Sequence, residues 1–110
     1  MVQKPVLILV TTDARDDAER IGEALVVEHL AGCCSVVPMV HSFYYWEDQL
    51  KREHEALLII KTLESLAPAV MEFVQTHHSY DLPEILQVPV EGGSSPYLSW
   101  LERQVAKPSL

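Results

Sequence analysis

The chain has 110 residues, of which 48% are hydrophobic, so it can bury the core of one domain, and we expect a single domain over residues 1–110. Eight basic residues against sixteen acidic ones give a formal net charge of −8, which repels nucleic-acid phosphates and chiefly favours solubility. The apolar stretch after the N-terminus is too short for a signal peptide or a membrane span, which predicts a cytoplasmic protein without a membrane partner.

The chain opens with a strand and a helix. Residues 6–10 form a continuous aliphatic run, which is typical of a strand that is buried on both faces, and the strand is expected over residues 6–12. Asp13 is a good N-cap for a helix over residues 14–30. Three acidic residues follow it near the positive end of the helix dipole, where they stabilise the helix. Apolar residues recur at helical spacing through this stretch.

A long hairpin follows, over residues 33–62. Its first strand is rich in β-branched and aromatic residues, residues 46–49 form the turn, and residues 50–62 run back. This turn places Tyr45 opposite Leu50, which fixes the expected register of the whole strand pair.

The last part of the chain alternates again between helix and strand. Ser65 can cap a second helix, which ends near His78. Residues 84–90 read as a strand whose proline favours an edge or an end of the sheet. Ser95 then caps a short helix that continues to Val105.

The resulting order of elements predicts an α+β fold of the ferredoxin-like βαββαβ type with an extra C-terminal helix. Two right-handed crossovers place both long helices on one face of a four-stranded sheet. Residues 6–10 and 57–60 are apolar at both parities, so the other face is apolar as well. A soluble monomer rarely exposes such a face, and another copy of the chain is its simplest cover.

Several separated segments resemble the divalent cation tolerance protein CutA family. They are Leu30-Ala31-Gly32-Cys33, Pro38, Ser42, Tyr44-Tyr45-Trp46-Glu47, Ile60-Lys61-Thr62, His78-Ser79-Tyr80-Asp81-Leu82-Pro83-Glu84-Ile85 and Pro96-Tyr97-Leu98 with Trp100-Leu101. The resemblance covers about residues 5–102 in order and without a sizeable gap.

The resemblance implies a tight homotrimer akin to the PII signalling proteins, with the long hairpin in the subunit contacts. It also implies a role in the tolerance of divalent metals, copper above all, without an enzymatic activity. We therefore expect a non-enzyme that binds a metal ion or a small ligand and needs no metal to fold. The alternatives are a PII-like sensor of a small metabolite and a purely structural, stable trimer.

Copper binding through His77 and His78 is the metal site that the resemblance implies. A cysteine that some members use as a further ligand corresponds here to Thr11, and a neutral hydroxyl is a poor ligand for Cu(I). Adjacent residues on a helix point about 100° apart, so the two histidines can share an ion only if the helix has ended there. The alternative for His77, which continues the apolar stripe of the helix, is a histidine at the edge of the core.

The expected hairpin register also places His41 opposite His54, about 5 Å apart at the β-carbon. Such a pair could hold a surface metal ion, and a slip of one residue would separate the side chains onto opposite faces. The alternative is a pair of solvated histidines.

Four polar or amphipathic residues of the family-like segments, Trp46, Lys61, Tyr80 and Glu84, are the predicted lining of a ligand pocket between subunits. Lys61 ends an apolar strand and needs an acceptor, for which Glu84 is the candidate. The alternative is a cluster of salt bridges and hydrogen bonds that fixes the assembly.

Support for catalysis is thin, because the sequence contains none of the common nucleotide-binding, metalloprotease or hydrolase motifs. Cys33 could act as a nucleophile, but burial in an apolar strand favours a packing role. It neighbours Cys34, and adjacent cysteines on a strand point to opposite faces, so both are expected to be reduced. Gly92 and Gly93 read as a turn, with an anion-binding nest as the alternative.

Overall fold

The structure is a computed structural model that describes residues 3–106. Its elements are β1 (Pro5–Thr12), α1 (Arg15–Val27), β2 (Cys33–Trp46), β3 (Gln49–Leu63), the 3₁₀ turn η1 (Glu64–Leu66), α2 (Ala67–His77), β4 (Ile85–Pro89) and α3 (Ser95–Val105).

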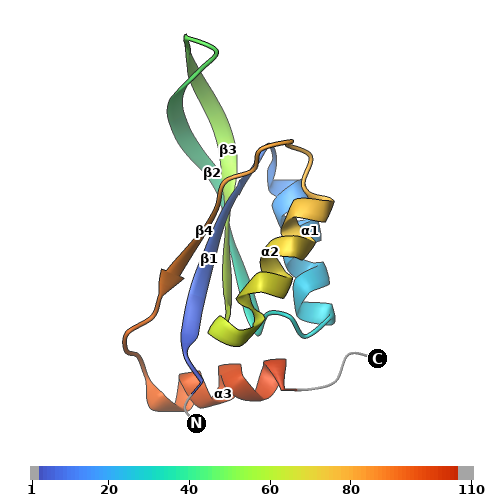
Figure 1. Cartoon of the computed structure of the whole chain (residues 1–110), viewed down its shortest axis with the longest axis vertical. Coiled ribbons are helices and arrows are strands. Elements are labelled where there is room, and N and C mark those ends of the chain that lie inside the picture. The colour runs from blue at the N-terminus through green and yellow to red at the C-terminus, as the bar shows by residue number, and fades with distance from the viewer. Residues whose placement is uncertain (1–2, 107–110) are drawn as a thin grey trace.

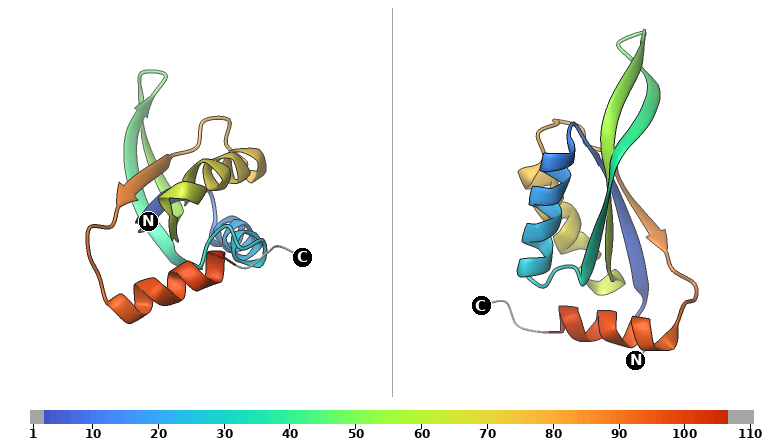
Figure 2. Two further views of the ribbon diagram at one scale, coloured as in Figure 1. Left: turned by 60° about the horizontal axis from the view of Figure 1, so that its bottom comes forward. Right: turned by 180° about the vertical axis from the view of Figure 1, so that it is seen from behind.

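All four strands form one sheet in the order β2-β3-β1-β4, with antiparallel neighbours throughout. Helices α1 and α2 lie side by side on one face, and α3 crosses the lower end of the sheet (Figures 1 and 2). This arrangement confirms the predicted ferredoxin-like fold with its C-terminal helix and its long hairpin. Apart from α3 at the lower end, no helix among residues 3–106 covers the second face of the sheet.

The two faces of the sheet differ in burial. On β1, Val6, Ile8 and Val10 are fully buried against the helices, whereas Leu7 and Leu9 are only half-buried. The aliphatic run is therefore buried on one face within a single chain, and not on both faces as predicted. The apolar residues that do not pack against the helices lie on the uncovered face of the sheet.

This uncovered side is called the open face below. Strand pairing places on it the apolar residues Leu7, Leu9, Val37, Leu57, Ile59, Leu86 and Val88, together with the polar residues Ser35 and Lys61.

The hairpin closes through a two-residue turn at Glu47 and Asp48, whose φ angles of 51° and 63° both lie in the left-handed region. Positive φ at both central positions is typical of a type I′ turn, which matches the twist of hairpin strands. The register pairs Tyr45 with Leu50, as predicted. Trp46 also pairs with Gln49, so both strands reach one residue further than expected.

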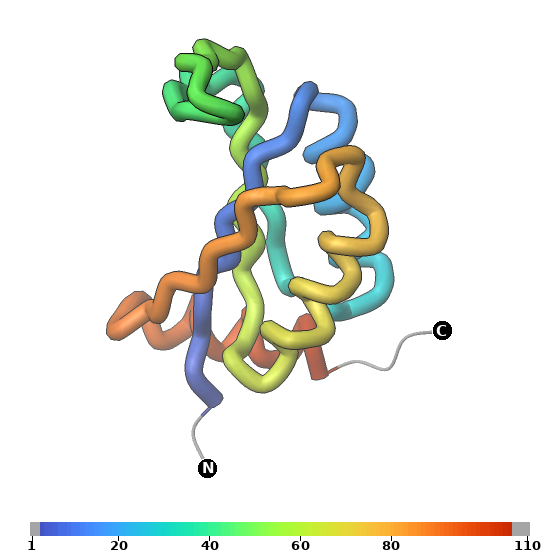
Figure 3. The backbone as a smooth tube through the Cα atoms, turned by 45° about the horizontal axis from the view of Figure 1, so that its top comes forward, coloured from blue at the N-terminus to red at the C-terminus, as the bar shows by residue number. Residues whose placement is uncertain are grey.

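A register irregularity interrupts the hairpin between Val37 and Val40, which pair with Leu57 and Glu55. Two residues of β2 therefore oppose one residue of β3, as in a β-bulge, and one of the two is a proline that cannot donate to the ladder. Beyond this point the strongly twisted hairpin projects away from the rest of the molecule (Figures 1 and 3).

The ends of α1 differ from the prediction. Ala14 occupies the N-cap position without a side-chain cap, and the hydroxyl of Thr12 donates to the carbonyl of Ala14 instead. The helix ends at Val27 rather than at residue 30, because His29 adopts a left-handed φ of 57°. The N–H groups that follow then turn back onto carbonyls of the last helical turn.

The predicted caps of the other two helices are also shifted. Ser65 lies in the 3₁₀ turn, and its hydroxyl donates to the side-chain oxygen of Gln3 rather than capping α2. Ser94, and not Ser95, caps α3, because its hydroxyl accepts from the backbone N–H of Tyr97. Each cap lies within one or two residues of the predicted position.

Candidate ligand-binding site

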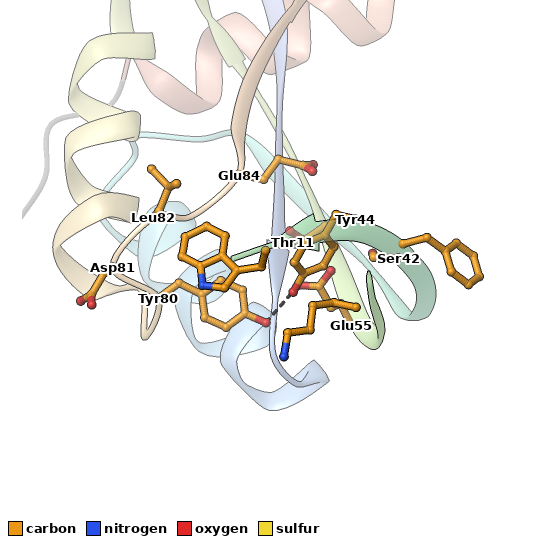
Figure 4. A pocket seen from close by; sticks show the side chains of 11 residues that line it. Thr11, Ser42, Tyr44, Glu55, Tyr80, Asp81, Leu82 and Glu84 are labelled. Atoms are coloured by element: carbon orange, nitrogen blue, oxygen red, sulfur yellow. Dashed lines mark hydrogen bonds between the residues drawn. The ribbon is translucent and has the colours of Figure 1, made fainter. Parts of the chain in front are cut away.

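A cavity of about 680 Å³ lies where the hairpin meets the end of β1 and the loop between α2 and β4 (Figure 4). We call it the hairpin pocket. Its lining consists of Thr11, Ser42, Phe43, Tyr44, Trp46, Lys51, Glu55, Tyr80, Asp81, Leu82 and Glu84.

Three of the four residues that were predicted to bind a ligand, Trp46, Tyr80 and Glu84, line this one pocket. They come from the hairpin and from the loop before β4, which lie far apart in the sequence. The topology of the sheet brings these two segments together at the end of β1 (Figure 1).

Lys61 lies elsewhere. Its Nζ donates to Ser35 Oγ at 2.9 Å and lies 3.5 Å from Cys33 Sγ, so Glu84 is not its partner within the chain, contrary to the expectation. Strand pairing sets Lys61 between Cys33 and Leu7 on the open face. Its neutral hydrogen-bond acceptors therefore come from the adjacent strand.

The polar centre of the pocket is Glu55, which the sequence reasoning did not single out. This carboxylate is only 6% exposed, and the hydroxyl of Tyr80 donates to its Oε2 at 2.9 Å (Figure 4). Burial, and then the bond to Glu55, raise the pKa of Tyr80, so the phenol stays neutral and remains a donor. The sequence signal that could have identified Glu55 is the period-two alternation of side chains along β3, which places it on the same side as Leu57 and Ile59.

The pocket combines aromatic surfaces with negative charge. Tyr44, Trp46 and Tyr80 offer ring faces, Glu55 and Glu84 supply carboxylates, and Lys51 adds one ammonium group. The carboxylate of Asp81 points away from the Tyr80–Glu55 pair in Figure 4. Aromatic faces and carboxylates together form the environment that attracts an organic cation.

His78 is fully engaged in backbone hydrogen bonds. Its Nε2 donates to the carbonyl of Thr11 at 2.7 Å, and its Nδ1 accepts from the N–H of Tyr80 at 3.0 Å. A carbonyl can only accept and an N–H can only donate, so the ring is the Nε2–H tautomer. His78 would have to break one of these bonds to bind a metal ion.

His77 is arranged differently, although it is the adjacent residue. Its Nδ1 donates to the carbonyl of Phe73 at 2.8 Å, and its ring stacks on the Phe73 ring with centroids 4.0 Å apart. The exposed ring keeps its Nε2 lone pair for a ligand. The helix ends at His77, so the two histidines stand at the point where the geometry changes from helical to extended.

No group of three or more histidine, cysteine or acidic side chains within residues 3–106 is arranged to hold a metal ion. A metal ion held by histidines of one chain would complete its coordination with water or with a second subunit.

Both cysteines are free thiols in the structure, in agreement with the expected reduced state. Burial, followed by the proximity of Cys33, raises the pKa of Cys34 from its ordinary value of 9.0 to about 12. A thiol that stays protonated at neutral pH is a poor nucleophile and a poor metal ligand.

The sequence matches the CutA1 divalent ion tolerance protein family over residues 6–104. The chain belongs to this family. The match includes the four strands except Pro5, and almost all of α3, so it covers both the hairpin pocket and the open face.

Curated CutA proteins from distant organisms are similar to this chain. A divalent-cation tolerance protein CutA of an Escherichia coli strain is 38% identical over 96 residues, which are 87% of this chain and 86% of that protein. A chloroplastic CutA 1 of Oryza sativa is 39% identical over 97 residues, or 88% of this chain and 55% of that protein. The chain spans about half the length of the plant and mammalian relatives that it matches.

Solved structures of CutA1 proteins have the same fold. The structure from Ehrlichia chaffeensis has a TM-score of 0.92 at 26% identity and covers 97% of this chain and all of that chain. A periplasmic CutA from Archaeoglobus fulgidus has a TM-score of 0.89 at 31% identity, covering 92% and 98% of the two chains. The names of the relatives indicate different compartments, since the Oryza sativa protein is chloroplastic and the Archaeoglobus fulgidus protein is periplasmic. Within residues 3–106, no helix is both long and apolar enough to cross a membrane.

Proposed function

We propose that this chain is a cytoplasmic homotrimer that contributes to the tolerance of divalent metal ions, copper foremost, by binding a small ligand or a metal ion. Membership of the CutA1 family supports the role in divalent ion tolerance. The expectation of binding rather than catalysis comes from the resemblance to the CutA family, and the hairpin pocket offers a place for the ligand.

The hairpin pocket is the observation that carries this proposal. Burying a carboxylate is costly unless donors or cations compensate it. Glu55 is buried in the pocket wall and receives its hydrogen bond from Tyr80, and none of the ion pairs among residues 3–106 involves it. Lys51 lines the same pocket but forms no ion pair with Glu55 among residues 3–106. A small organic cation, stacked on Trp46 and paired with Glu55, would supply that positive charge.

Isothermal titration with choline and putrescine as cationic probes, and with ATP as an anionic one, tests this pocket. We expect a cationic probe to bind, and both Glu55→Gln and Trp46→Leu to weaken that binding at least tenfold. Tyr45→Phe is the matched control, because Tyr45 is an exposed neighbour on the hairpin that does not line the pocket. Binding of ATP alone, or equal affinities in all variants, would contradict the proposal.

The open face supports the homotrimer. Half-buried Leu9 and Ile59 lie beside Leu86, which is 55% exposed, and monomers rarely leave such a sheet face in water. With one kind of chain, a symmetric assembly of copies is the simplest cover. The threefold order comes from the resemblance to the CutA family.

For the metal ion, the predicted pair His77 and His78 remains part of the proposal. His77 is the better ligand of the two, because its Nε2 is uncommitted whereas both nitrogens of His78 bond to the backbone.

A further inference from the structure

A second pair of histidines faces each other across the hairpin. His41 on β2 pairs directly with His54 on β3, which confirms the register that the sequence predicted. Their ring centroids lie 4.6 Å apart with the ring planes tilted by 47°. Both side chains are exposed in the single chain, so an ion can reach them there from solvent.

The ring nitrogens of this pair are uncommitted. Among the side-chain hydrogen bonds of residues 3–106, none involves His41 or His54, whereas the rings of His29, His77 and His78 each bond to a backbone carbonyl. Two neighbouring imidazoles that lack other partners can turn a lone pair each toward a shared ion.

We propose that His41 and His54 form a binding site for a divalent transition-metal ion, with Cu²⁺ bound most tightly. Imidazole nitrogen suits first-row transition metals, and affinity among them peaks at copper. Directly opposed residues on antiparallel strands have β-carbons about 4.5–5.5 Å apart, which allows both rings to reach one ion through nitrogen–metal bonds of about 2 Å. Water completes the coordination.

The β-bulge before Val40 helps to hold this geometry. A slip of one residue would send the two histidines to opposite faces, and the irregularity between Val37 and Val40 interrupts the ladder immediately before His41. The two-residue turn fixes the register from the other side. The pair is therefore held between two features that both specify the alignment of the strands.

This site is separate from the hairpin pocket. Neither histidine lines that pocket, and His54 precedes Glu55, so the two side chains point to opposite sides of β3. A test of the metal site is therefore independent of whether the pocket binds a ligand. An ion bound there would link the two strands of the projecting hairpin.

Titration of the full chain with Cu²⁺, by calorimetry and by electron paramagnetic resonance, tests this inference. We expect His41→Gln and His54→Gln each to weaken one class of copper site at least tenfold and to remove the two-nitrogen signature from the spectrum. Glu53→Gln is the matched control, because it removes a neighbouring negative charge from the opposite side of β3 and should change the affinity less than twofold.

Three results would overturn the inference. They are the absence of copper binding at micromolar concentration, unchanged affinity in both His41→Gln and His54→Gln, and a loss of this site only in His77→Gln or His78→Gln. Circular dichroism of each variant establishes that an affinity change reflects lost ligands, because both substitutions lie on the exposed hairpin.

Discussion

Cys34 illustrates how burial determines the chemistry of a single side chain in this protein. Its pKa rises from 9.0 to about 12 in the folded chain, chiefly through burial. The unfolded chain releases the thiol proton above about pH 9 while the folded chain retains it, so stability must fall as the pH rises through this window.

We therefore expect the free energy of unfolding to fall by about 1.4 kcal/mol from this group between pH 8 and pH 10, since one pKa unit corresponds to about that energy. Urea unfolding at one fixed protein concentration measures the fall. The Cys34→Ala variant should lose less stability over the same pH interval. An identical pH dependence in both proteins would contradict the assignment.

Only part of the candidate site could be predicted from the sequence. Trp46, Tyr80 and Glu84, which were predicted to line a ligand pocket between subunits, lie together in a pocket of the single chain, whereas Lys61 does not. Lys61 pairs with Leu7, and the pocket begins at Thr11, four residues along β1, which is about 13 Å at about 3.3 Å per residue. The distance follows from strand pairing, which the family-like segments alone do not specify.

Glu55 could not be recognised from its residue type. Acidic residues are rarely buried, and the hydrophobic pattern of β3 begins only after it. Its burial depends on Tyr80, which the loop before β4 supplies from 25 positions away. Such a long-range contact appears only once the topology is known.

At the scale of elements, the strands and helices could be predicted because hydrophobic periodicity is strong in this chain. The helix ends could not be predicted, because they depend on the hydrogen-bond partner that each hydroxyl group finds. Thr12 bonds to Ala14, and Ser65 bonds to Gln3 instead of capping α2. The hairpin register was predictable because the position of the turn determines which residues pair. The bulge near Val40 was not predictable, because the turn position does not reveal an irregularity further along the strands.

The packing of α3 against the sheet gives a test at this scale. A β-carbon added at Gly32 would lie 2.4 Å from Leu101 Cδ1, and Leu101 is only 2% exposed. Gly32→Ala must therefore move the buried Leu101 side chain, or displace α3 or the segment before β2. We expect it to lower the free energy of unfolding by about 1–3 kcal/mol, as overpacked sites commonly do.

Gly92→Ala is the matched control for this substitution, because a β-carbon there meets nothing within 4 Å. Thermal and urea unfolding of both variants measure the difference. If the two substitutions had equal effects, the tight contact between α3 and the start of β2 would not exist in solution.

At the scale of the whole molecule, the arrangement of charge and apolar surface favours assembly. A formal charge of −8 keeps the chain soluble, while the open face concentrates the aliphatic side chains that the helices do not cover. The exposed hairpin aromatics Tyr44 and Trp46, which lie on the Glu55 side of the strand pair, extend this apolar surface beyond the sheet. The proposed ligand pocket and the proposed assembly surface therefore meet at the same end of the molecule, where the hairpin joins the open face.

Sedimentation equilibrium of the wild-type chain and of Ile59→Lys tests the central claim that the open face joins copies into a trimer. We expect the wild type to sediment at three times the chain mass of 12.4 kDa and Ile59→Lys at the mass of a monomer. Val27→Lys, an exposed position on α1, should remain trimeric. A wild-type chain that stays at 12.4 kDa at micromolar concentration would contradict the account.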